Sequence, residues 1–210
     1  MLGVASGTWG THIPSVGAQY SLSDVTLSLV LLAVAVGTVS ALFFAGTVIA
    51  RIGARNTAAV FGLSMGLSLC LVLEYPGLPA LLPAMLLFGA TMSLCDVAIN
   101  TEGSELETLG GRAIMSSLHG MFSVGGMLGA GLTFGLLEMH VAPRLQLFIV
   151  GGGVAVIALV ASRAMLETHA SADGDARHFA WPKGVLLLIG LLIFAGMSAE
   201  GVMSTGACST

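Results

Sequence analysis

Residues 25–50 read VTLSLVLLAVAVGTVSALFFAGTVIA and contain no charged side chain. A helix needs about 20 mostly apolar residues to cross the hydrocarbon core of a bilayer, so this stretch is long enough to be a membrane span. The rest of the chain contains six further apolar stretches of this kind. The sequence therefore predicts seven membrane-spanning helices, at about residues 1–18, 25–50, 57–73, 78–100, 114–137, 145–165 and 184–203.

The composition of the whole chain favours an all-α membrane protein. Of 210 residues, 56% are hydrophobic and 9% are charged, whereas a soluble domain carries about 25% charged residues. Seven lysines and arginines are too few for a basic patch that binds nucleic acid. The chain also lacks a Walker loop, an H-E-x-x-H helix and cysteines at metal-ligand spacing. The sequence thus predicts no enzyme, no cofactor and no metal.

The connections between the apolar stretches predict how the helices are organised. All of them are short except residues 166–183, a polar stretch that separates six spans from a seventh. Short links make neighbouring helices antiparallel. A six-span unit at residues 1–165, a linker and a further span at residues 184–203 form the layout of a secondary transporter with two halves. In that fold each half contains two inverted repeats of three helices.

The positive charges predict the orientation in the membrane. The links after the second, fourth and sixth spans, with the end of the sixth, carry six of the seven lysines and arginines, and Arg144 alone lies on the other side. Because links rich in lysine and arginine stay in the cytoplasm, the N-terminus is expected to be cytoplasmic. The six residues are Arg51, Arg55, Arg112, Arg163, Arg177 and Lys183.

Asp96, in the predicted fourth span, is the first candidate for a functional site. A carboxylate at membrane depth is costly unless it faces a cavity or a partner. Asn100 follows one helical turn later and lies on the same helix face. Together they predict a proton-coupling or substrate-binding site. Two alternatives stay open, namely a span that ends early and leaves Asp96 at the cytoplasmic surface, and a structural hydrogen bond between helices.

Four other residues are weaker candidates for a solute or proton pathway. His119 in the fifth span could relay protons or bind a polar ligand, or could pack against a carbonyl group. Trp9 and His12 in the first span could line a sugar-like site, or could belong to the interfacial belt of aromatic side chains, which is favoured for His12. Glu200, late in the seventh span, could line a cavity or lie at the outer interface.

Glycines in the predicted fifth span indicate close helix packing. They are Gly125, Gly129, Gly131 and Gly135. Three carboxylates, Glu102, Glu105 and Glu107, follow the predicted fourth span, and most of them are interpreted as loop residues in water. An acidic loop is expected from Glu105 to Arg112, in which Glu105 or Glu107 could pair with Arg51, Arg55 or Arg112.

Residues 46–55, GTVIARIGAR, resemble a loop signature of the major facilitator superfamily, G-x-L-x-D-R-x-G-x-R. Gly46, Arg51, Gly53 and Arg55 occupy its glycine and arginine positions, and Ala50 replaces its acidic residue. The chain is most similar to the MosC-like branch of that superfamily. The most specific matching stretches are DVAIN at residues 96–100 and RAIMSSLHG at residues 112–120. A further matching stretch is GTW at residues 7–9.

The resemblance implies a secondary active transporter of a small polar solute, sugar-like or rhizopine-like, in a bacterial inner membrane. Fucose:proton symporters are more distant relatives, and Asp96 and Asn100 match the E-x-x-x-N pattern of their fourth span. This implies proton coupling. The alternative is a non-transporting membrane fragment, or a half-transporter that needs a second copy or a separate C-terminal half.

The end of the chain departs from the family pattern. MosC-like proteins continue past E-G-x-M into an A-D-W-S-like stretch, whereas residues 204–210 here read STGACST. One choice of codons for residues 205–210 encodes a Trp-Ser pair when the reading frame is set back by one base. This pair matches the Trp-Ser of the family pattern. We therefore expect residues 204–210 to be a frameshifted tail that follows the start of a missing C-terminal half.

Overall fold

The computed structural model describes residues 1–166, 184, 185, 187, 188, 191 and 192, and these residues contain helices and no strand. The prediction of an all-α fold is confirmed. The chain divides into two compact units, Met1–Ala176 and Arg177–Thr210, and the five helices below all lie in the first. They are α1 (Leu2–Gln19), α2 (Asp24–Leu71), α3 (Leu78–Gly110), α4 (Met115–Glu138) and α5 (Pro143–Ser162). The predicted span at residues 184–203 lies largely outside the described residues.

Helix α2 contains two predicted spans, joined at Gly53. Its 48 residues would measure about 72 Å if straight, more than twice the hydrocarbon thickness of a bilayer. Gly53 leaves the helical conformation with φ 79° and ψ 158°, a backbone region that side chains with a Cβ rarely adopt. The turn that the sequence predicts over residues 51–55 is therefore reduced to one glycine. We call residues 24–52 limb 1 and residues 54–71 limb 2.

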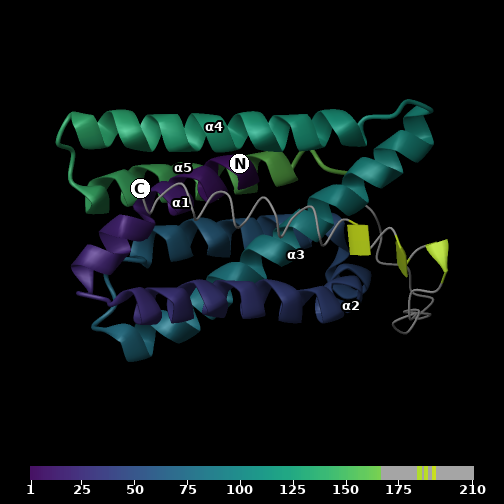
Figure 1. Cartoon of the computed structure of the whole chain (residues 1–210). Coiled ribbons are helices and arrows are strands. Elements are labelled where there is room, and N and C mark those ends of the chain that lie inside the picture. The colour runs from purple at the N-terminus through teal and green to yellow at the C-terminus, as the bar shows by residue number, and fades with distance from the viewer. Residues whose placement is uncertain (167–183, 186, 189–190, 193–210) are drawn as a thin grey trace. The chain divides into compact units, whose positions relative to one another are not determined.

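Limb 1 packs in parallel against α3. A Cβ on Gly37 would lie 1.9 Å from the Leu86 carbonyl oxygen, and farther along both helices Ala45 belongs to the same apolar cluster as Leu94. Limb 2 runs the other way along α3. Its end at Leu71 is joined by a short turn to the start of α3 at Leu78, while farther along α3 Cys95 Sγ lies 3.8 Å from the carbonyl oxygen of Ala58, near the start of the limb. The chain thus reverses direction at Gly53 (Figure 1).

The other two helix pairs also approach each other at glycines. Helix α4 lies parallel to α1, with a Cβ on Gly7 only 2.1 Å from the Gly126 carbonyl oxygen. Helix α5 lies antiparallel to limb 2, where a Cβ on Gly66 would lie 2.6 Å from the Gly151 carbonyl oxygen. Exchanging α1, limb 1 and limb 2 with α3, α4 and α5 maps these three pairs onto one another. The pairing is the one expected of two three-helix repeats.

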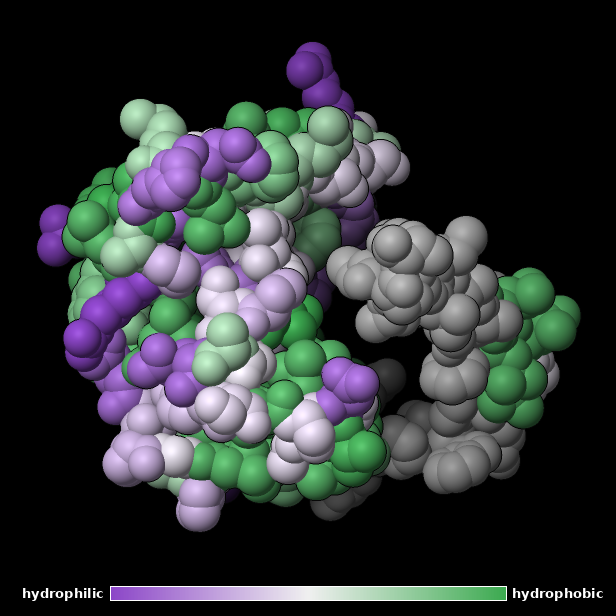
Figure 2. Space-filling view, turned by 60° about the vertical axis from the view of Figure 1, so that its left-hand side comes forward, coloured by the Kyte–Doolittle hydropathy of each residue, from purple (hydrophilic) through white to green (hydrophobic). Residues whose placement is uncertain are grey.

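The surface of the described unit is extensively apolar. Limb 1 and α4 expose large side chains, among them Phe44 at 64%, Met127 at 76% and Leu128 at 64%. In Figure 2, which turns the left side of Figure 1 forward, hydrophilic side chains form patches between apolar ones. Soluble monomers rarely expose so much contiguous apolar surface. Lipid is the solvent that suits it.

Four helices, α2, α3, α4 and α5, are long and apolar enough to cross a membrane. The predicted helix at residues 1–18 is present as α1 but is not one of the four. Its polar residues explain this, and two of them, Thr8 and His12, have no exposed surface. Because these side chains point into the bundle, α1 shows a less apolar sequence than its neighbours.

Helix α3 ends later than predicted. The sequence predicts an end near Asn100 and an acidic loop from Glu105, whereas the helix continues to Gly110. Gly111 then adopts a left-handed conformation with φ 61°, and its N–H donates to the Glu107 carbonyl oxygen. Residues such as Glu and Leu favour helices, and a left-handed glycine is the usual stop. The acidic segment is therefore helical.

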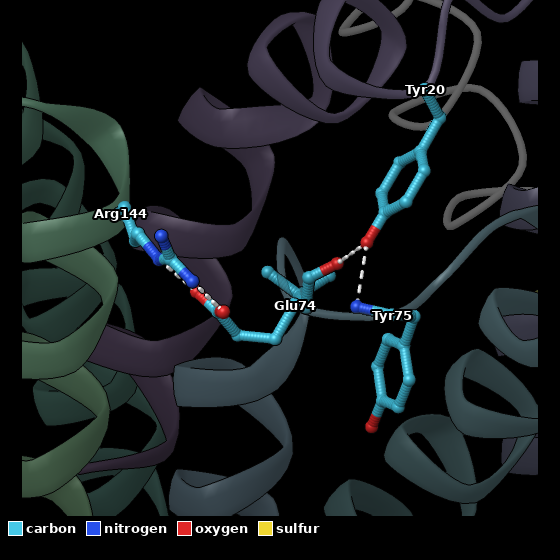
Figure 3. A network of polar contacts seen from close by, with 5 residues as sticks. Tyr20, Glu74, Tyr75 and Arg144 are labelled. Carbon is cyan, nitrogen blue, oxygen red and sulfur yellow. Dashed lines mark hydrogen bonds and ion pairs between the residues drawn. The ribbon is translucent and has the colours of Figure 1, made fainter.

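A polar network joins three segments at the end of the bundle where α1 stops (Figure 3). The Tyr20 hydroxyl donates to the Val72 carbonyl oxygen at 2.8 Å and accepts from the Tyr75 N–H at 3.1 Å. Beside it, the Arg144 guanidinium at the start of α5 forms a two-bond ion pair with Glu74. The turn between α2 and α3 is thereby tied to both α1 and α5.

The glycine contacts predict opposite effects for two identical substitutions on α4. A Cβ on Gly129 would lie 2.4 Å from the Val4 carbonyl oxygen, whereas nothing lies within 4 Å of one on Gly131. Gly129→Ala is expected to destabilise the fold by about 1–3 kcal/mol through overpacking. Gly131→Ala is expected to be neutral or stabilising, since alanine favours helices. Thermal unfolding in detergent tests both, and equal effects would contradict the packing.

The ion pair predicts a pH effect on stability. The hydrogen bond from Arg144 lowers the pKa of Glu74 below its ordinary value of 4.5. A lowered folded-state pKa stabilises the fold above the unfolded pKa, and this contribution is lost as the pH falls through the folded pKa. Wild type should therefore lose more thermal stability below pH 4.5 than Glu74→Gln. The difference will be small because the pair is solvent-screened, and parallel pH profiles would refute it.

Candidate functional site

One face of α3 carries the polar residues nearest to α4. Asp96, Asn100, Gly103 and Glu107 are spaced by four, three and four residues, so they form one stripe along the helix. A Cβ on Gly103 would lie 2.6 Å from Leu118 Cδ1. The stripe therefore faces α4, which runs antiparallel to this part of α3.

Two of the residues predicted for the site lie on this stripe, and Asn100 Nδ2 donates to Asp96 Oδ2 at 3.2 Å. The third, His119, lies on α4 four residues after Met115, and Met115 Sδ would lie 2.8 Å from a Cβ on Gly103. Residues four apart share one helix face, so His119 is on the side of α4 that meets α3. Asp96 and His119 are both exposed in the described unit. The arrangement provides an acid and an imidazole, which can take up and release protons, and an amide, which can hydrogen-bond to a polar solute.

Trp9 and His12 lie elsewhere, in the core of the bundle. The Trp9 ring packs against Phe88 with centroids 5.6 Å apart. His12 has no exposed surface, and its Nδ1 lies 3.3 Å from Ser15 Oγ. Its Nε2 has no hydrogen-bond partner among the described residues. The favoured interpretation of His12 as an interfacial belt residue is wrong, since a belt side chain would face the headgroups.

Two carboxylates interpreted from sequence as loop residues are instead structural. Glu107 Oε1 accepts from the backbone N–H groups of Ile114 at 2.6 Å and Met115 at 2.8 Å. Glu102 is 7% exposed, and its Oε1 accepts from the Leu166 N–H at 2.7 Å. All three bonds join helix α3 to a segment beyond its own C-terminus. Periodicity and local capping rules do not reveal them, because the partners are far apart in sequence.

The loop signature contributes one constrained residue. Gly53 has the positive φ at which limb 1 ends, as described above. Nothing lies within 4 Å of a Cβ on Gly46, so close packing does not require glycine there. Arg51 is exposed and Arg55 is half-buried. Of the two glycines of the signature, Gly53 is therefore the one whose backbone conformation requires glycine.

The remaining sequence candidates and the metal-ligating residue types provide no further site in the described residues. Glu200 and residues 204–210 lie outside the described part of the chain. Within the described part, no three His, Cys, Asp or Glu side chains are grouped to hold a metal ion. Cys70 and Cys95 are buried thiols.

The chain is similar to three curated membrane proteins. It is 34% identical to an uncharacterized MFS-type transporter of Yersinia pestis, over 96% of this chain and 52% of that protein. It is 29% identical to an uncharacterized transporter of Sinorhizobium fredii, over 95% and 53% of the two chains. It is also 29% identical to the membrane protein MosC of Rhizobium meliloti, over 96% and 49%.

In all three comparisons the chain spans about half the length of the curated relative that it matches. No family model and no solved structure matches it.

The buried carboxylate of Glu102 allows a stability test. Glu102→Ala removes the acceptor of the Leu166 N–H and is expected to cost about 1–3 kcal/mol. Glu102→Gln keeps an oxygen acceptor and removes a charge that is costly to bury, so it should match or exceed wild type in thermal stability. If Glu102→Gln destabilises as much as Glu102→Ala in detergent unfolding, the carboxylate acts through its charge and this interpretation is wrong.

Proposed function

The chain is a homologue of MFS-type transporters, which confirms the resemblance seen in the sequence, and from that premise we propose that it is half of a secondary active transporter. The proposed cargo is a small polar solute of sugar-like or rhizopine-like chemistry. The proposed location is a bacterial inner membrane, with the N-terminus in the cytoplasm, in keeping with the distribution of lysine and arginine.

The observation that carries the proposal is the group Asp96, Asn100 and His119 on adjoining faces of α3 and α4. An ionisable residue on a membrane helix is costly to keep there and is usually functional. We propose that Asp96 takes up and releases the coupling proton. The amide of Asn100, which donates to Asp96 Oδ2 at 3.2 Å, favours the carboxylate. Protonation then weakens that hydrogen bond and frees the amide for solute.

His119 is the proposed third polar group of the site. As a cation its imidazole would attract the Asp96 carboxylate, so the attraction depends on the charges of both groups. A proton that neutralises Asp96 removes this attraction. The site therefore has two charge states that differ in how strongly α3 and α4 attract each other. Trp9 and His12 stay secondary candidates because they lie in the core of the unit. Glu200 stays a secondary candidate because it lies outside the described residues.

A complete transport site is proposed to need a second six-helix unit. Sites in this fold form between two halves, and Asp96 and His119 are exposed on one face of the described unit. The opposite wall would come from a second copy of this chain or from a separate C-terminal half. The alternative function is a membrane fragment that does not transport.

The direct test is solute uptake into proteoliposomes under an imposed pH gradient, with a panel of inositol-like and sugar-like solutes. We expect pH-driven uptake with the chain and, in Asp96→Asn, a fall to the level of empty liposomes, because the amide cannot carry the proton. Glu138→Gln is the matched control, since Glu138 is an exposed carboxylate at the far end of α4. Unchanged pH-driven uptake by Asp96→Asn would refute the assignment of the proton site.

The same assay separates the alternatives. Uptake by the chain alone, with a dimer detected by crosslinking in the same vesicles, supports a second copy as the missing wall. Uptake only after addition of a C-terminal half supports a two-chain transporter. Absence of uptake in both arms supports the fragment that does not transport.

A further inference from the structure

Helix α4 begins without a cap of its own. Its N-cap residue is Ile114, whose side chain cannot accept a hydrogen bond. The first N–H groups of any helix lack partners within the helix and need an acceptor from elsewhere. Glu107 on α3 supplies it, since its Oε1 accepts from Ile114 at 2.6 Å and from Met115 at 2.8 Å. One carboxylate of α3 therefore completes the start of α4, where negative charge also suits the helix dipole.

A second contact fixes the same turn of α4. Gly103 leaves no room for a side chain, because a Cβ there would lie 2.6 Å from Leu118 Cδ1 and 2.8 Å from Met115 Sδ. Met115 is thus held by its N–H through Glu107 and by its side chain against Gly103. Two contacts at different heights on α3 define both the position and the rotation of the first turn of α4.

That rotation decides where His119 points. Leu118 and His119 follow Met115 by three and four residues, so all three lie on one face of α4. Met115 and Leu118 contact α3 at Gly103 and Glu107, so His119 on the same face is directed toward the stripe that carries Asp96. Farther along, α4 approaches α1 at glycines such as Gly129, whereas its first turn meets α3 at Gly103 and Glu107.

We propose that Glu107 is a positioning residue that holds α4 so that His119 faces Asp96. In the described unit the hydrogen bonds of Glu107 go to the backbone N–H groups of Ile114 and Met115, so it acts through the backbone of α4. The inference rests on the proposed function insofar as Asp96 and His119 form its site. It adds a residue that sets the geometry of the pair without touching proton or solute.

The test measures whether His119 still senses Asp96 when the cap is removed. The full chain is labelled with ¹⁵N-histidine, placed in lipid nanodiscs, and the His119 side-chain resonance is assigned by its loss in His119→Asn. The quantity measured is the chemical-shift change of His119 caused by Asp96→Asn. It is compared in the wild-type, Glu107→Gln and Glu107→Ala backgrounds, at one pH.

We expect the response to persist in wild type and in Glu107→Gln, which retains an oxygen acceptor, and to fall at least about twofold in Glu107→Ala. Glu107→Asp is the second variant in case Glu107→Ala does not fold. It keeps the charge but shortens the side chain, so an intermediate response is expected. Glu138→Ala, which removes a carboxylate from the other end of α4, is the control and should leave the response unchanged.

A cap that only stabilises α4 would lower the unfolding temperature of Glu107→Ala and leave the response of His119 intact. An equal response in wild type and Glu107→Ala would overturn the positioning role, while the Asp96–His119 pair and the proposed function would stand. No response even in wild type would overturn the inference together with the pairing of Asp96 and His119. Neither outcome depends on transport, which the uptake assay measures separately.

Discussion

The fold depends on the direct approach of helix backbones at glycine. Lipid tails are as apolar as leucine side chains, so helices in a membrane gain little from burying apolar surface against each other and rely on close packing instead. Three pairs of helices here meet where a Cβ would lie 1.9–2.6 Å from a facing carbonyl oxygen, at Gly37, Gly7 and Gly66. These contacts set which helices are neighbours. The position of every polar side chain in the bundle follows from them.

Helix boundaries were largely predictable because hydropathy reports them directly. Apolar runs gave α1, both limbs of α2, α4 and α5 within a few residues, and the positive φ of Gly53 is what a glycine at a tight reversal suggests. The predicted end of α3 near Asn100 is too early, because a polar segment after an apolar run does not have to be a loop. Glutamates are good helix formers, so the acidic segment continues the helix outside the apolar run.

Contacts between side chains were less predictable, for a geometric reason. The sequence predicts close packing for the four glycines of α4, yet Gly125 and Gly129 face α1, while no described residue lies within 4 Å of a Cβ on Gly131 or Gly135. Spacing alone cannot say which side of a helix has a neighbour. Asp96 and Asn100 were paired correctly because a turn of helix joins them, whereas the bonds of Glu102 and Glu107 link residues that only tertiary structure brings together.

The polar residues of the unit divide into an inner and an outer group, and this division bears on how coupling would work. Thr8, His12 and Gln146 are fully buried, so they change surroundings only if the unit itself rearranges. Asp96 and His119 are exposed on the unit, so a second unit moving over them can change their access to water without any change inside the bundle. Alternating access of this kind requires that each unit stay rigid while the two move. For the proposed Asp96–His119 pair to work in this way, its geometry would have to be fixed within one unit, and the Glu107 carboxylate and the Gly103 contact, both on the same helix as Asp96, would meet that requirement.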